Sequence, residues 1–398
     1  MPAKTDKIIP RALAKTAASL LKKYPVLTIT GPRQSGKTTL ARLLFPNKPH
    51  VNLEAPDVRR FAQNDPRAFL AEYAGGAVLD EIQRAPELLS YLQPILDETG
   101  QTGRFILTGS QQFEMMRHVS QSLAGRTAIL RLLPFSLDEI RAHRPDFSTD
   151  DWIFTGFYPR IHQAGIPPSQ GYSDYYASYV ERDIRQLINV RNHSLFDRFV
   201  RLCAGRVGQV LNLSSLASDT GITHPTAREW LSLLETSFIV STLTPFFANT
   251  TKRLTKAPKL YFHDTGLAAW LCDITDASQL ATHPLRGAFF ENLAFIELQK
   301  HNYNHALNRR LHYYRDNLCE VDFLWPSGGK LLPIEAKAAR TIASGFSKGL
   351  DYFRQNHPNQ SAAGGIITYD GDTSRKTSDG KLYCPINQLA RQLARTLP

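Results

Sequence analysis

The sequence predicts an α/β protein in which a parallel sheet comes first, a helical module follows, and a second α/β module comes last. Three observations predict this order. Short apolar runs alternate with amphipathic stretches over residues 1–150, a Pro/Gly/Ser-rich stretch covers 143–175, and apolar strands return after Gly287. The length of 398 residues suits two to three domains.

The first module is predicted to be a parallel sheet with helices on both faces, because strands and helices alternate along it. An amphipathic helix over 10–24 ends at Pro25, and the apolar strand Val26–Ile29 follows it. Further along we expect helices over Thr38–Leu44, Pro86–Glu98 and Ser136–Ala142, and strands over Val51–Leu53, Ala77–Leu79, Arg104–Leu107 and Ala128–Leu132.

The later part of the chain changes character twice. Residues 143–175 are predicted to form a linker or lid, and the pattern from Tyr175 to about Trp270 is mainly helical, with one strand-rich insert. The last module should contain helices over Phe289–His301, Ala343–Gln355 and the final residues, and strands over Leu311–Tyr314, Val321–Trp325, Leu331–Ala336 and Ala363–Thr368. The predicted domains are therefore 1–150, 151–275 and 276–398.

Composition limits the partners and the compartment. The net charge of +11 suits a polyanionic partner such as DNA, and it equally suits lysines scattered over the surface. No apolar run of about 18 residues is present, the N-terminal segment lacks the features of a signal peptide, and the four cysteines are too far apart for a metal knuckle. We therefore expect a reduced, cytoplasmic protein without a membrane partner.

The strongest motif is GPRQSGKT at residues 31–38, which fits the phosphate-binding pattern GxxxxGK[ST] without a mismatch. Glycines let backbone N–H groups curve around phosphate oxygens, and the start of the following helix adds partial positive charge. We expect Lys37 to reach the β- and γ-phosphates of ATP, and the Thr38 hydroxyl to ligate Mg²⁺. The predicted nucleotide-binding residues are Gly31, Pro32, Arg33, Gln34, Ser35, Gly36, Lys37, Thr38 and Thr39.

A second element, AVLDE at 77–81, is an apolar strand that ends in two acids. Asp80 is placed to hold Mg²⁺ through water, and Glu81 is placed to polarise the attacking water as a catalytic residue. Phosphoryl transfer depends mainly on positioning and charge compensation, so this small set of groups is sufficient for ATP hydrolysis.

Two further positions are candidates for contact with the γ-phosphate. FILTGS at 105–110 is a strand that ends in small polar residues, and either Ser110 or Thr108 could sense the phosphate; an ordinary turn with a satisfied hydroxyl is the alternative. Arg126 could act on the phosphate of its own or of a neighbouring subunit, whereas a plain surface arginine is the alternative. The sequence leaves a homo-oligomer open.

Several stretches resemble one family. GPRQSGKTTLARLLFP, VLDEIQRAPELLSYL, FILTGSQQF and LAGRTAILRLLPFSLDEI resemble the AAA-type ATPases of bacteria and archaea that carry a C-terminal DUF4143 domain. YYASYVERDIRQL, KLYFHDTGLAAWL, FFENLAFIELQK, YYRDNLCEVDFLW and PIEAKAA are also similar to that family. The resemblance covers nearly the whole chain, with the DUF4143 region expected at about 175–340. It implies a P-loop NTPase core of AAA type, a winged-helix middle and a restriction-endonuclease-like end.

The middle module contains a helix-turn-helix pattern at 213–240, with Gly221 where a turn between two helices needs it. Leu243–Phe262 adds a basic, hairpin-like segment that suits a wing gripping DNA phosphates through Lys252, Arg253, Lys256 and Lys259. A winged helix that serves as a lid or docking module is the alternative, because a fold does not fix a function.

Carboxylates in the last module form a D…ExK pattern, with Asp322 on one strand and Glu335 and Lys337 on the next. Two carboxylates on adjacent strands can share one Mg²⁺, and Lys337 can then orient water or stabilise the phosphate as a catalytic residue. Glu291, on the preceding helix, could reach the same metal. The arrangement resembles that of the PD-(D/E)XK phosphodiesterases; solvated acids on two strands, or a fold kept only as a binding platform, are the alternatives.

The sequence thus predicts a Mg²⁺-dependent ATPase whose nucleotide state controls a nuclease-like domain that acts on DNA. Two alternatives stay open. One is an ATPase signalling switch whose last domain is inactive and only binds a partner. The other is an ATP-responsive DNA-binding regulator, for which the helix over 224–235 offers only Arg228 as an obvious base reader.

Overall fold

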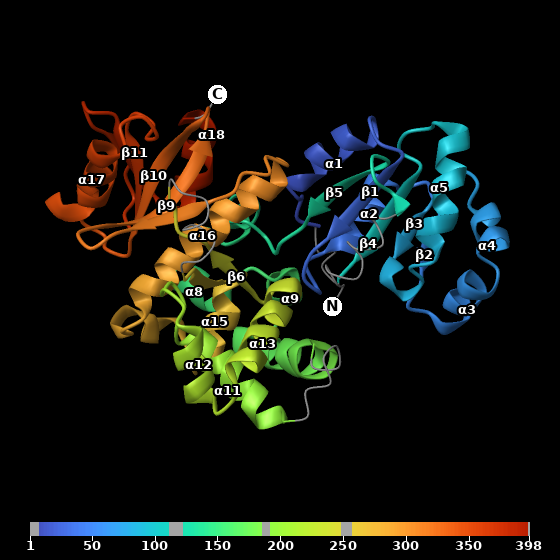
Figure 1. The fold of residues 1–398 in the computed structure, drawn as a ribbon, viewed down its shortest axis with the longest axis horizontal. Helices are drawn as coiled ribbons and strands as arrows, with labels where there is room; N and C mark the ends of the chain where they lie inside the picture. The colour runs from blue at the N-terminus through green and yellow to red at the C-terminus, as the bar shows by residue number, and fades with distance from the viewer. Residues whose placement is uncertain (1–7, 111–121, 185–191, 248–256, 397–398) are drawn as a thin grey trace, which may run out of the picture. The chain divides into compact units, whose positions relative to one another are not determined.

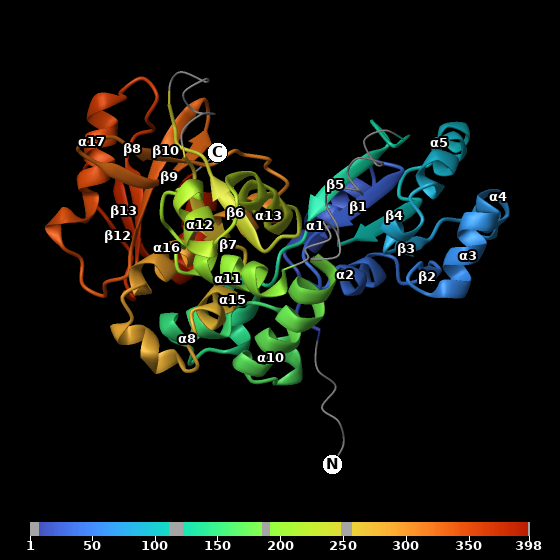
Figure 2. The same cartoon turned by 60° about the horizontal axis from the view of Figure 1, so that its bottom comes forward.

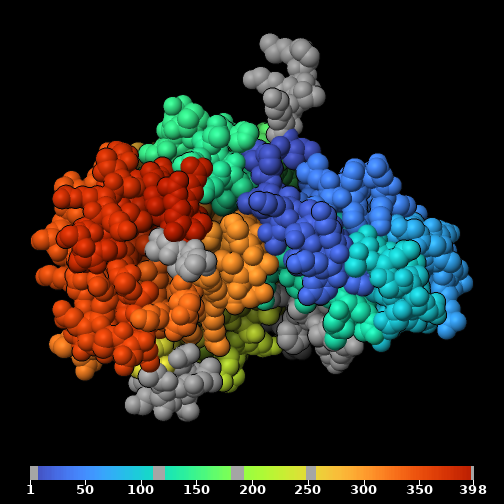
Figure 3. All heavy atoms as spheres, turned by 90° about the horizontal axis from the view of Figure 1, so that it is seen from above, coloured from blue at the N-terminus to red at the C-terminus, as the bar shows by residue number. Residues whose placement is uncertain are grey.

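A computed structural model describes residues 8–110, 122–184, 192–247 and 257–396, which are drawn in colour in Figures 1, 2 and 3. The chain divides into two compact units. The first comprises Met1–Phe135 with Thr236–Phe238 and Tyr303–Leu307, and the second comprises Ser136–Glu235, Ile239–Asn302 and Asn308–Pro398. None of the helices in the described ranges has the length and apolar character needed to cross a bilayer.

The first unit contains the predicted parallel sheet, with the strand order β2-β3-β4-β1-β5 (Figure 1). Its strands are β1 (Val26–Thr30), β2 (His50–Asn52), β3 (Val78–Asp80), β4 (Phe105–Gly109) and β5 (Thr127–Arg131). Because β4 lies between β1 and β3, the residues that end β4 fall between the loop after β1 and the acids after β3.

Helices cover both faces of this sheet, because its strands are apolar on both faces. One face packs on α1 (Leu13–Leu21) and α2 (Lys37–Leu44), and the other on α3 (Pro56–Asn64), α4 (Pro66–Glu72) and α5 (Leu88–Thr99). The apolar pattern did not predict α3 and α4, each of which begins with a proline at its first position.

The segment 143–175, which was expected to be a linker or lid, folds into three short helices. They are α8 (Thr149–Thr155), α9 (Pro159–Ala164) and α10 (Pro168–Tyr175), and a short helix α7 (Leu137–Ile140) precedes them. The residues that suggested a linker start these helices instead. Ser148 caps α8 in a capping box, and prolines open α9 and α10. Trp152 and Tyr172 are buried in the core that the helices form.

The middle of the second unit contains helices and one antiparallel strand pair. The elements are a π-helical turn (Tyr176–Ile184), α11 (His193–Ala204), α12 (Leu213–Thr220), α13 (His224–Thr236), β6 (Val240–Leu243), β7 (Lys259–Phe262) and α15 (Thr265–Leu271). Gly221 lies between α12 and α13 with φ of 85°, as the expected turn requires. Val210 forms a further antiparallel bridge to Lys259, beside the β6–β7 pair.

The last part of the second unit contains a mixed sheet with the strand order β12-β13-β11-β10-β9-β8 (Figure 2). Its elements are α16 (Arg286–Asn304), β8 (His312–Arg315), β9 (Glu320–Ser327), β10 (Lys330–Lys337), α17 (Lys348–Asn356), β11 (Gly365–Tyr369), β12 (Arg375–Lys376), β13 (Lys381–Pro385) and α18 (Leu389–Thr396). Strands β8, β9 and β10 are antiparallel neighbours, and β11 runs parallel to β10. Phe323 of β9 packs toward α16, and Leu324 packs with α17 on the other face.

Candidate functional site

The loop between β1 and α2 can form only with glycine at its first position. Gly31 has φ of 149°, and a Cβ atom there would lie 2.1 Å from the carbonyl oxygen of Leu132. Gln34 and Gly36 also have left-handed backbones, with φ of 61° and 92°. The first N–H groups of α2 have no partner within the helix and are therefore free to bind phosphate oxygens.

Lys37 is the buried cation of this loop. Its Nζ donates to the carbonyl oxygens of Gly31 and Pro32, at 3.0 and 2.7 Å, and its side chain is almost wholly buried. Burial lowers the pKa of Lys37 to about 8, even though Glu81 and Asp80 attract its charge. The ammonium group of Lys37 thus hydrogen-bonds to the backbone of its own loop.

Arg11, which is largely buried, anchors the loop through its backbone, a role that no sequence motif indicated. Its guanidinium donates to the carbonyl oxygens of Ser35 at 2.7 Å and Leu133 at 2.6 Å, and it lies over the ring of Phe135. These contacts join the loop to the segment after β5. Because the partners lie 24 and 122 residues away, no local motif could have indicated them.

Asp80, at the end of β3, accepts hydrogen bonds from two hydroxyl groups. The Thr38 hydroxyl donates to its two carboxylate oxygens at 2.9 and 3.2 Å, and the Thr108 hydroxyl, from β4, also hydrogen-bonds to it. The sheet order brings these three residues together, although 42 and 28 residues separate them along the chain. Thr108 also accepts a hydrogen bond from the backbone N–H of Glu81 at 3.3 Å.

Glu81 follows Asp80 with φ of 57°, a left-handed backbone that is uncommon for a residue other than glycine. Its carboxylate accepts hydrogen bonds from the Ser110 hydroxyl at 3.3 Å and from the amide of Gln83. Ser110, a candidate phosphate sensor, therefore holds Glu81 here, while Thr108 holds Asp80. Gln83 is a further residue of this site, and no motif indicated it.

The residues of this site fit a nucleotide with Mg²⁺. The hydroxyl of Ser35 is completely buried and has no hydrogen-bond partner among the residues that the structure describes. The hydroxyl of Thr38 and the carboxylate of Asp80 are the oxygen ligands that Mg²⁺ prefers. Arg33, Gln34 and Thr39 remain at least partly exposed on the same loop and first turn.

Arg126 cannot act on the phosphate of its own chain in this arrangement, so that prediction is wrong. It directly precedes β5, and β5 runs parallel to β1 with Thr127 beside Val26. Arg126 therefore lies at the amino edge of the sheet, about 16 Å from the loop at its carboxyl edge, at roughly 3.3 Å per strand residue. It forms an ion pair with Asp97, with N–O distances of 2.6 and 2.7 Å. A contact with a neighbouring subunit stays a prediction.

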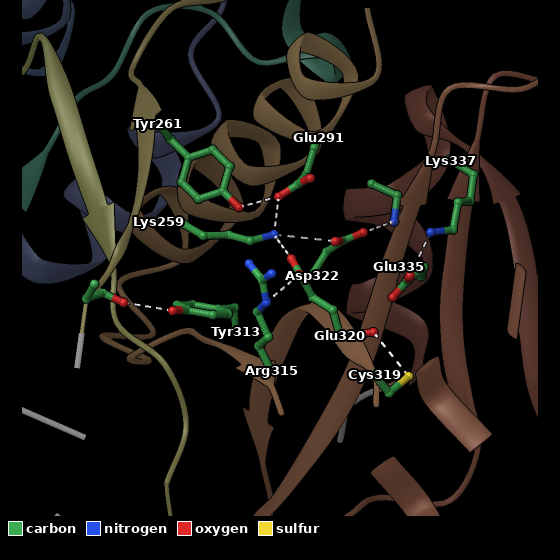
Figure 4. Close-up of polar contacts among 12 residues, drawn as sticks. Lys259, Tyr261, Glu291, Tyr313, Arg315, Cys319, Glu320, Asp322, Glu335 and Lys337 are labelled. Carbon is green, nitrogen blue, oxygen red and sulfur yellow. Dashed lines mark hydrogen bonds and ion pairs between the residues drawn. The ribbon is translucent and has the colours of Figure 1, made fainter. Parts of the chain in front are cut away.

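A cluster of carboxylates forms in the second unit, where β9 and β10 run side by side (Figure 4). Asp322 of β9 accepts a hydrogen bond at 2.9 Å from the backbone N–H of Ala336, in β10. Lys337 donates to Glu335 at 2.7 Å. The D…ExK residues therefore meet across two adjacent strands, as predicted.

Lys259 of β7 reaches into this cluster (Figure 4). Its Nζ lies 2.8 Å from Glu291 and 3.6 Å from Asp322, and it also forms an ion pair with Glu320. Only 2% of Lys259 is exposed, so the prediction that it grips DNA phosphates as part of a wing is wrong. The other basic residues of that segment, Lys252, Arg253 and Lys256, lie outside the described residues.

Charge and burial set the pKa values of this cluster. Burial alone would lower the pKa of Lys259, but the charges of Asp322, Glu291 and Glu320 outweigh it and raise the pKa well above its usual value. Burial, and then the charge of Asp322, raise the pKa values of both Glu291 and Glu335.

The cluster also differs from the expected metal site. Within the described residues, no group of three or more His, Cys, Asp or Glu side chains is arranged to hold a metal ion. Glu291, Asp322 and Glu335 were expected to share one metal. Two of them, together with Glu320, converge instead on Lys259.

Comparison with known families gives three consecutive matches. The AAA domain matches residues 23–141, a domain of unknown function (DUF8612) matches 146–278, and another (DUF4143) matches 286–389. The DUF4143 match thus begins well after residue 175, where the resemblance placed the start of that region.

Two curated proteins match most of the chain. Uncharacterized proteins of Mycobacterium tuberculosis and Mycobacterium bovis are each 30% identical to it over 376 residues, which covers 93% of this chain and 82% of theirs. Among solved structures, a Walker-type ATPase of Pyrococcus abyssi is 16% identical with a TM-score of 0.44, and covers 66% of this chain and 96% of its own. A signal transduction ATPase with numerous domains from Pyrococcus horikoshii is 12% identical with a TM-score of 0.29, over 72% of this chain and 47% of its own.

The parallel sheet, the phosphate loop and the match to the AAA domain define an ATP-binding ATPase of the P-loop class. The chain belongs to the same family as the two mycobacterial proteins, the AAA-type ATPases with a C-terminal DUF4143 domain.

Proposed function

We propose that the chain is a Mg²⁺-dependent ATPase that acts as a nucleotide-controlled switch on its second unit. The observation that carries the proposal is the hydrogen-bonded set of Thr38, Asp80, Thr108 and Glu81, which joins the phosphate loop to the ends of two neighbouring strands. Phosphoryl transfer needs such groups held in fixed positions more than it needs covalent chemistry.

Each residue has a distinct part in the proposed reaction. When ATP binds, Lys37 gives up its hydrogen bonds to the carbonyl oxygens of Gly31 and Pro32 and donates to oxygen atoms of the β- and γ-phosphates. Thr38 and Asp80 hold Mg²⁺, which supplies charge compensation for the phosphates. Glu81, oriented by Ser110 and Gln83, accepts the proton of the attacking water as the bond from the γ-phosphorus to the ADP oxygen breaks.

The test of this site compares Glu81→Gln with Lys37→Ala. We expect Glu81→Gln to bind ATP within a few-fold of wild type but to lose about 100-fold or more of the turnover, because only the base is removed. We expect Lys37→Ala to lose nucleotide binding. Steady-state phosphate release and equilibrium ATP binding measure the two effects, and Glu87→Gln, an exposed carboxylate nearby, is the matched control. Wild-type turnover in Glu81→Gln would show that another group positions the water.

We further propose the division into modules at 1–150, 151–275 and 276–398, with a winged helix in the middle and a restriction-endonuclease-like fold at the end. The order α11, the Val210 bridge, α12, α13, β6 and β7 supports the winged helix. The order α16, antiparallel β8–β9–β10, α17 and parallel β11 supports the nuclease-like fold, together with the meeting of Asp322, Glu335 and Lys337.

The position of Lys259 favours a last domain that does not cleave DNA in its resting state. Its ammonium group already neutralises charge in the carboxylate cluster, which a Mg²⁺-dependent nuclease would reserve for metal. We therefore expect the wild-type chain to leave single-stranded, duplex and branched DNA intact with Mg²⁺ or Mn²⁺ and without ATP.

A DNA cleavage assay with and without ATP, comparing wild type with Glu335→Ala, decides what the last domain does. Cleavage that needs ATP and disappears in the variant would establish a nuclease gated by nucleotide. No cleavage under any condition would favour the partner-binding switch, and DNA binding at a fixed sequence without cleavage would favour the ATP-responsive regulator. Cleavage that is independent of ATP would contradict the resting state proposed here.

A further inference from the structure

The buried ammonium group of Lys259 has no part in the proposed ATPase reaction. We propose that Lys259 is a tethered cation that occupies the carboxylate cluster of Glu291, Glu320 and Asp322 in place of a divalent metal ion, so that Lys259 and a metal ion compete for the same oxygens. The inference goes beyond the proposed function, because it concerns which cation the cluster holds and not what the chain hydrolyses or cleaves.

Three carboxylates from two elements converge on one nitrogen atom. Glu291 comes from α16, and Glu320 and Asp322 come from alternate positions of β9, so that their side chains leave the same face of the strand. An ammonium group has three N–H donors and no acceptor. The Nζ atom of Lys259 donates to Glu291 at 2.8 Å, forms an ion pair with Glu320, and lies 3.6 Å from Asp322, which is an ion-pair contact and not a hydrogen bond. Hard divalent ions such as Mg²⁺ and Mn²⁺ prefer the same kind of oxygen ligands.

The backbone fixes Lys259 in this position. Lys259 pairs with Leu243 in the β6–β7 ladder and with Val210 on its other side, so its strand is held from both edges. Two residues earlier, the carbonyl oxygen of Ala257 accepts a hydrogen bond from the Tyr313 hydroxyl at 2.7 Å. The ammonium group therefore reaches the cluster from a strand that is paired on both sides.

Burial favours a cation in this cluster. Buried carboxylates without a compensating charge are strongly unfavourable, and removing one partner of a buried ion pair leaves the other uncompensated. The side chains of Lys259 and Asp322 are only 3% and 10% exposed. If the ammonium group is removed, Arg315, which lies 3.5 Å from Glu320, supplies part of the compensating charge. The rest has to come from bound protons or from a divalent ion, which prefers such oxygen ligands.

A second observation points to a missing ligand on the strand beside the cluster. Glu335 is 6% exposed, and its Oε2 atom has no hydrogen-bond partner among the described residues, while its other oxygen accepts from Lys337. Asp322, which reaches Lys259 through one oxygen, accepts from the backbone beside Glu335 through the other. Beside the cluster, Glu335 thus retains a carboxylate oxygen without a hydrogen-bond partner among the described residues, which a metal ion could engage once Lys259 has left.

Mn²⁺ binding to the full-length chain, measured without nucleotide by electron paramagnetic resonance, tests the proposal. All variants carry Asp80→Asn, so that the phosphate loop contributes little metal binding. We expect this parent to show no Mn²⁺ site tighter than about 1 mM, the weak end of protein sites for hard divalent ions. We expect added Lys259→Met to create one site at least tenfold tighter, because methionine keeps the volume and removes the charge.

Lys300→Met is the matched control. Lys300 is also a buried ammonium group of the second unit, 1% exposed and 2.8 Å from Glu297, but it lies outside the carboxylate cluster. Its removal should therefore create no Mn²⁺ site. Adding Asp322→Asn to the Lys259→Met variant should abolish the new site, which would assign it to the cluster.

The proposal is overturned if Lys259→Met binds Mn²⁺ no more tightly than the parent, or if the parent itself has a tight site that Asp322→Asn removes. The second outcome needs no Lys259 variant, so the proposal stays testable even if Lys259→Met and the milder Lys259→Gln both fail to fold. These results are independent of the proposed ATPase and of DNA cleavage. A new Mn²⁺ site without cleavage would leave this inference standing and would count only against the nuclease-like function.

Discussion

At the scale of single residues, the nucleotide site depends on backbone geometry that few residue types can adopt. Gly31 passes so close to Leu132 that a methyl group would meet a backbone oxygen, which cannot rotate away as a side chain can. Glu81 adopts a left-handed backbone at the point where its carboxylate is needed. Such conformations persist only where surrounding contacts impose them. Here the hydrogen bonds from Ser110 and Gln83 hold the Glu81 side chain.

Substituting Gly31 should therefore be costly. We expect Gly31→Ala to destabilise the first unit by about 3 kcal/mol or more and to abolish ATP binding, because the clash with Leu132 adds to the backbone strain. Gly75→Ala is the control, since a Cβ at Gly75 would meet nothing within 4 Å and the backbone there is not left-handed. Urea unfolding and nucleotide binding measure the effect. Equal stability of the two variants would contradict this account of the loop.

At the scale of secondary-structure elements, the core under α8, α9 and α10 buries a histidine. His162 of α9 is 8% exposed and interacts with the carbonyl oxygen of Gly156 at 2.8 Å, and its ring lies 6.3 Å from that of Trp152. Burial, and then the positive charges of Arg144 and Lys300, lower the pKa of His162 to about 4, although the Gly156 carbonyl opposes them.

This burial makes the second unit sensitive to acid. The folded pKa of about 4 lies below the unfolded value of about 6.5, so the unfolded chain binds more protons between these limits. The stabilising contribution is complete above pH 6.5 and is lost as the pH falls toward 4. We expect about 2 kcal/mol less stability at pH 4.5 than at pH 7 from this group alone.

Tryptophan fluorescence during urea unfolding measures this loss, because all four tryptophans lie in the second unit. His162→Gln, which keeps an N–H donor for Gly156 but does not titrate, should show a correspondingly smaller loss of stability between pH 7 and pH 4.5. If both proteins lose the same stability over this range, His162 is not the group responsible.

At the scale of the whole molecule, the chain joins two compact units, each with its own sheet. Residues 236–238 and 303–307 belong to the first unit, although the chain on either side of them belongs to the second. The chain therefore crosses between the units more than once. A nucleotide-driven change in the first unit thus has more than one covalent connection to the second.

Arg126 lies at the amino edge of the sheet, so it could contact a bound nucleotide only in a neighbouring subunit. We expect Arg126→Ala to retain ATP turnover within about twofold, because the Asp97–Arg126 pair lies away from the phosphate loop. Turnover measured over a range of protein concentrations tests this. A loss of 1,000-fold or more in the variant, with wild-type specific activity that rises with concentration, would instead place Arg126 at the active site of a neighbouring subunit. Asp97→Asn, which frees Arg126 without removing it, is the control.

The sequence by itself determined the features that depend on residues close together in the chain, namely the phosphate loop and the parallel sheet. Residues 31–38 are contiguous, and their glycines, lysine and threonine have to follow a buried strand and open a helix, so a short motif specifies the loop. The alternation of strands and helices specified the parallel sheet for the same reason. The prolines at 143–175 open helices instead of marking a loop, because proline fits the first position of a helix, where no backbone N–H is needed.

Only the tertiary structure decided which distant charges meet. Nothing in the sequence distinguishes Lys259 from a solvated basic residue of a hairpin, yet β7 directs it among carboxylates 32 to 63 residues further along. In the same way, Arg11 reaches the phosphate loop, and Arg126 lies at the wrong edge for the role its position suggested. The physical reason is that a buried charge needs a partner in space, and the fold of the whole unit determines which residues occupy that space.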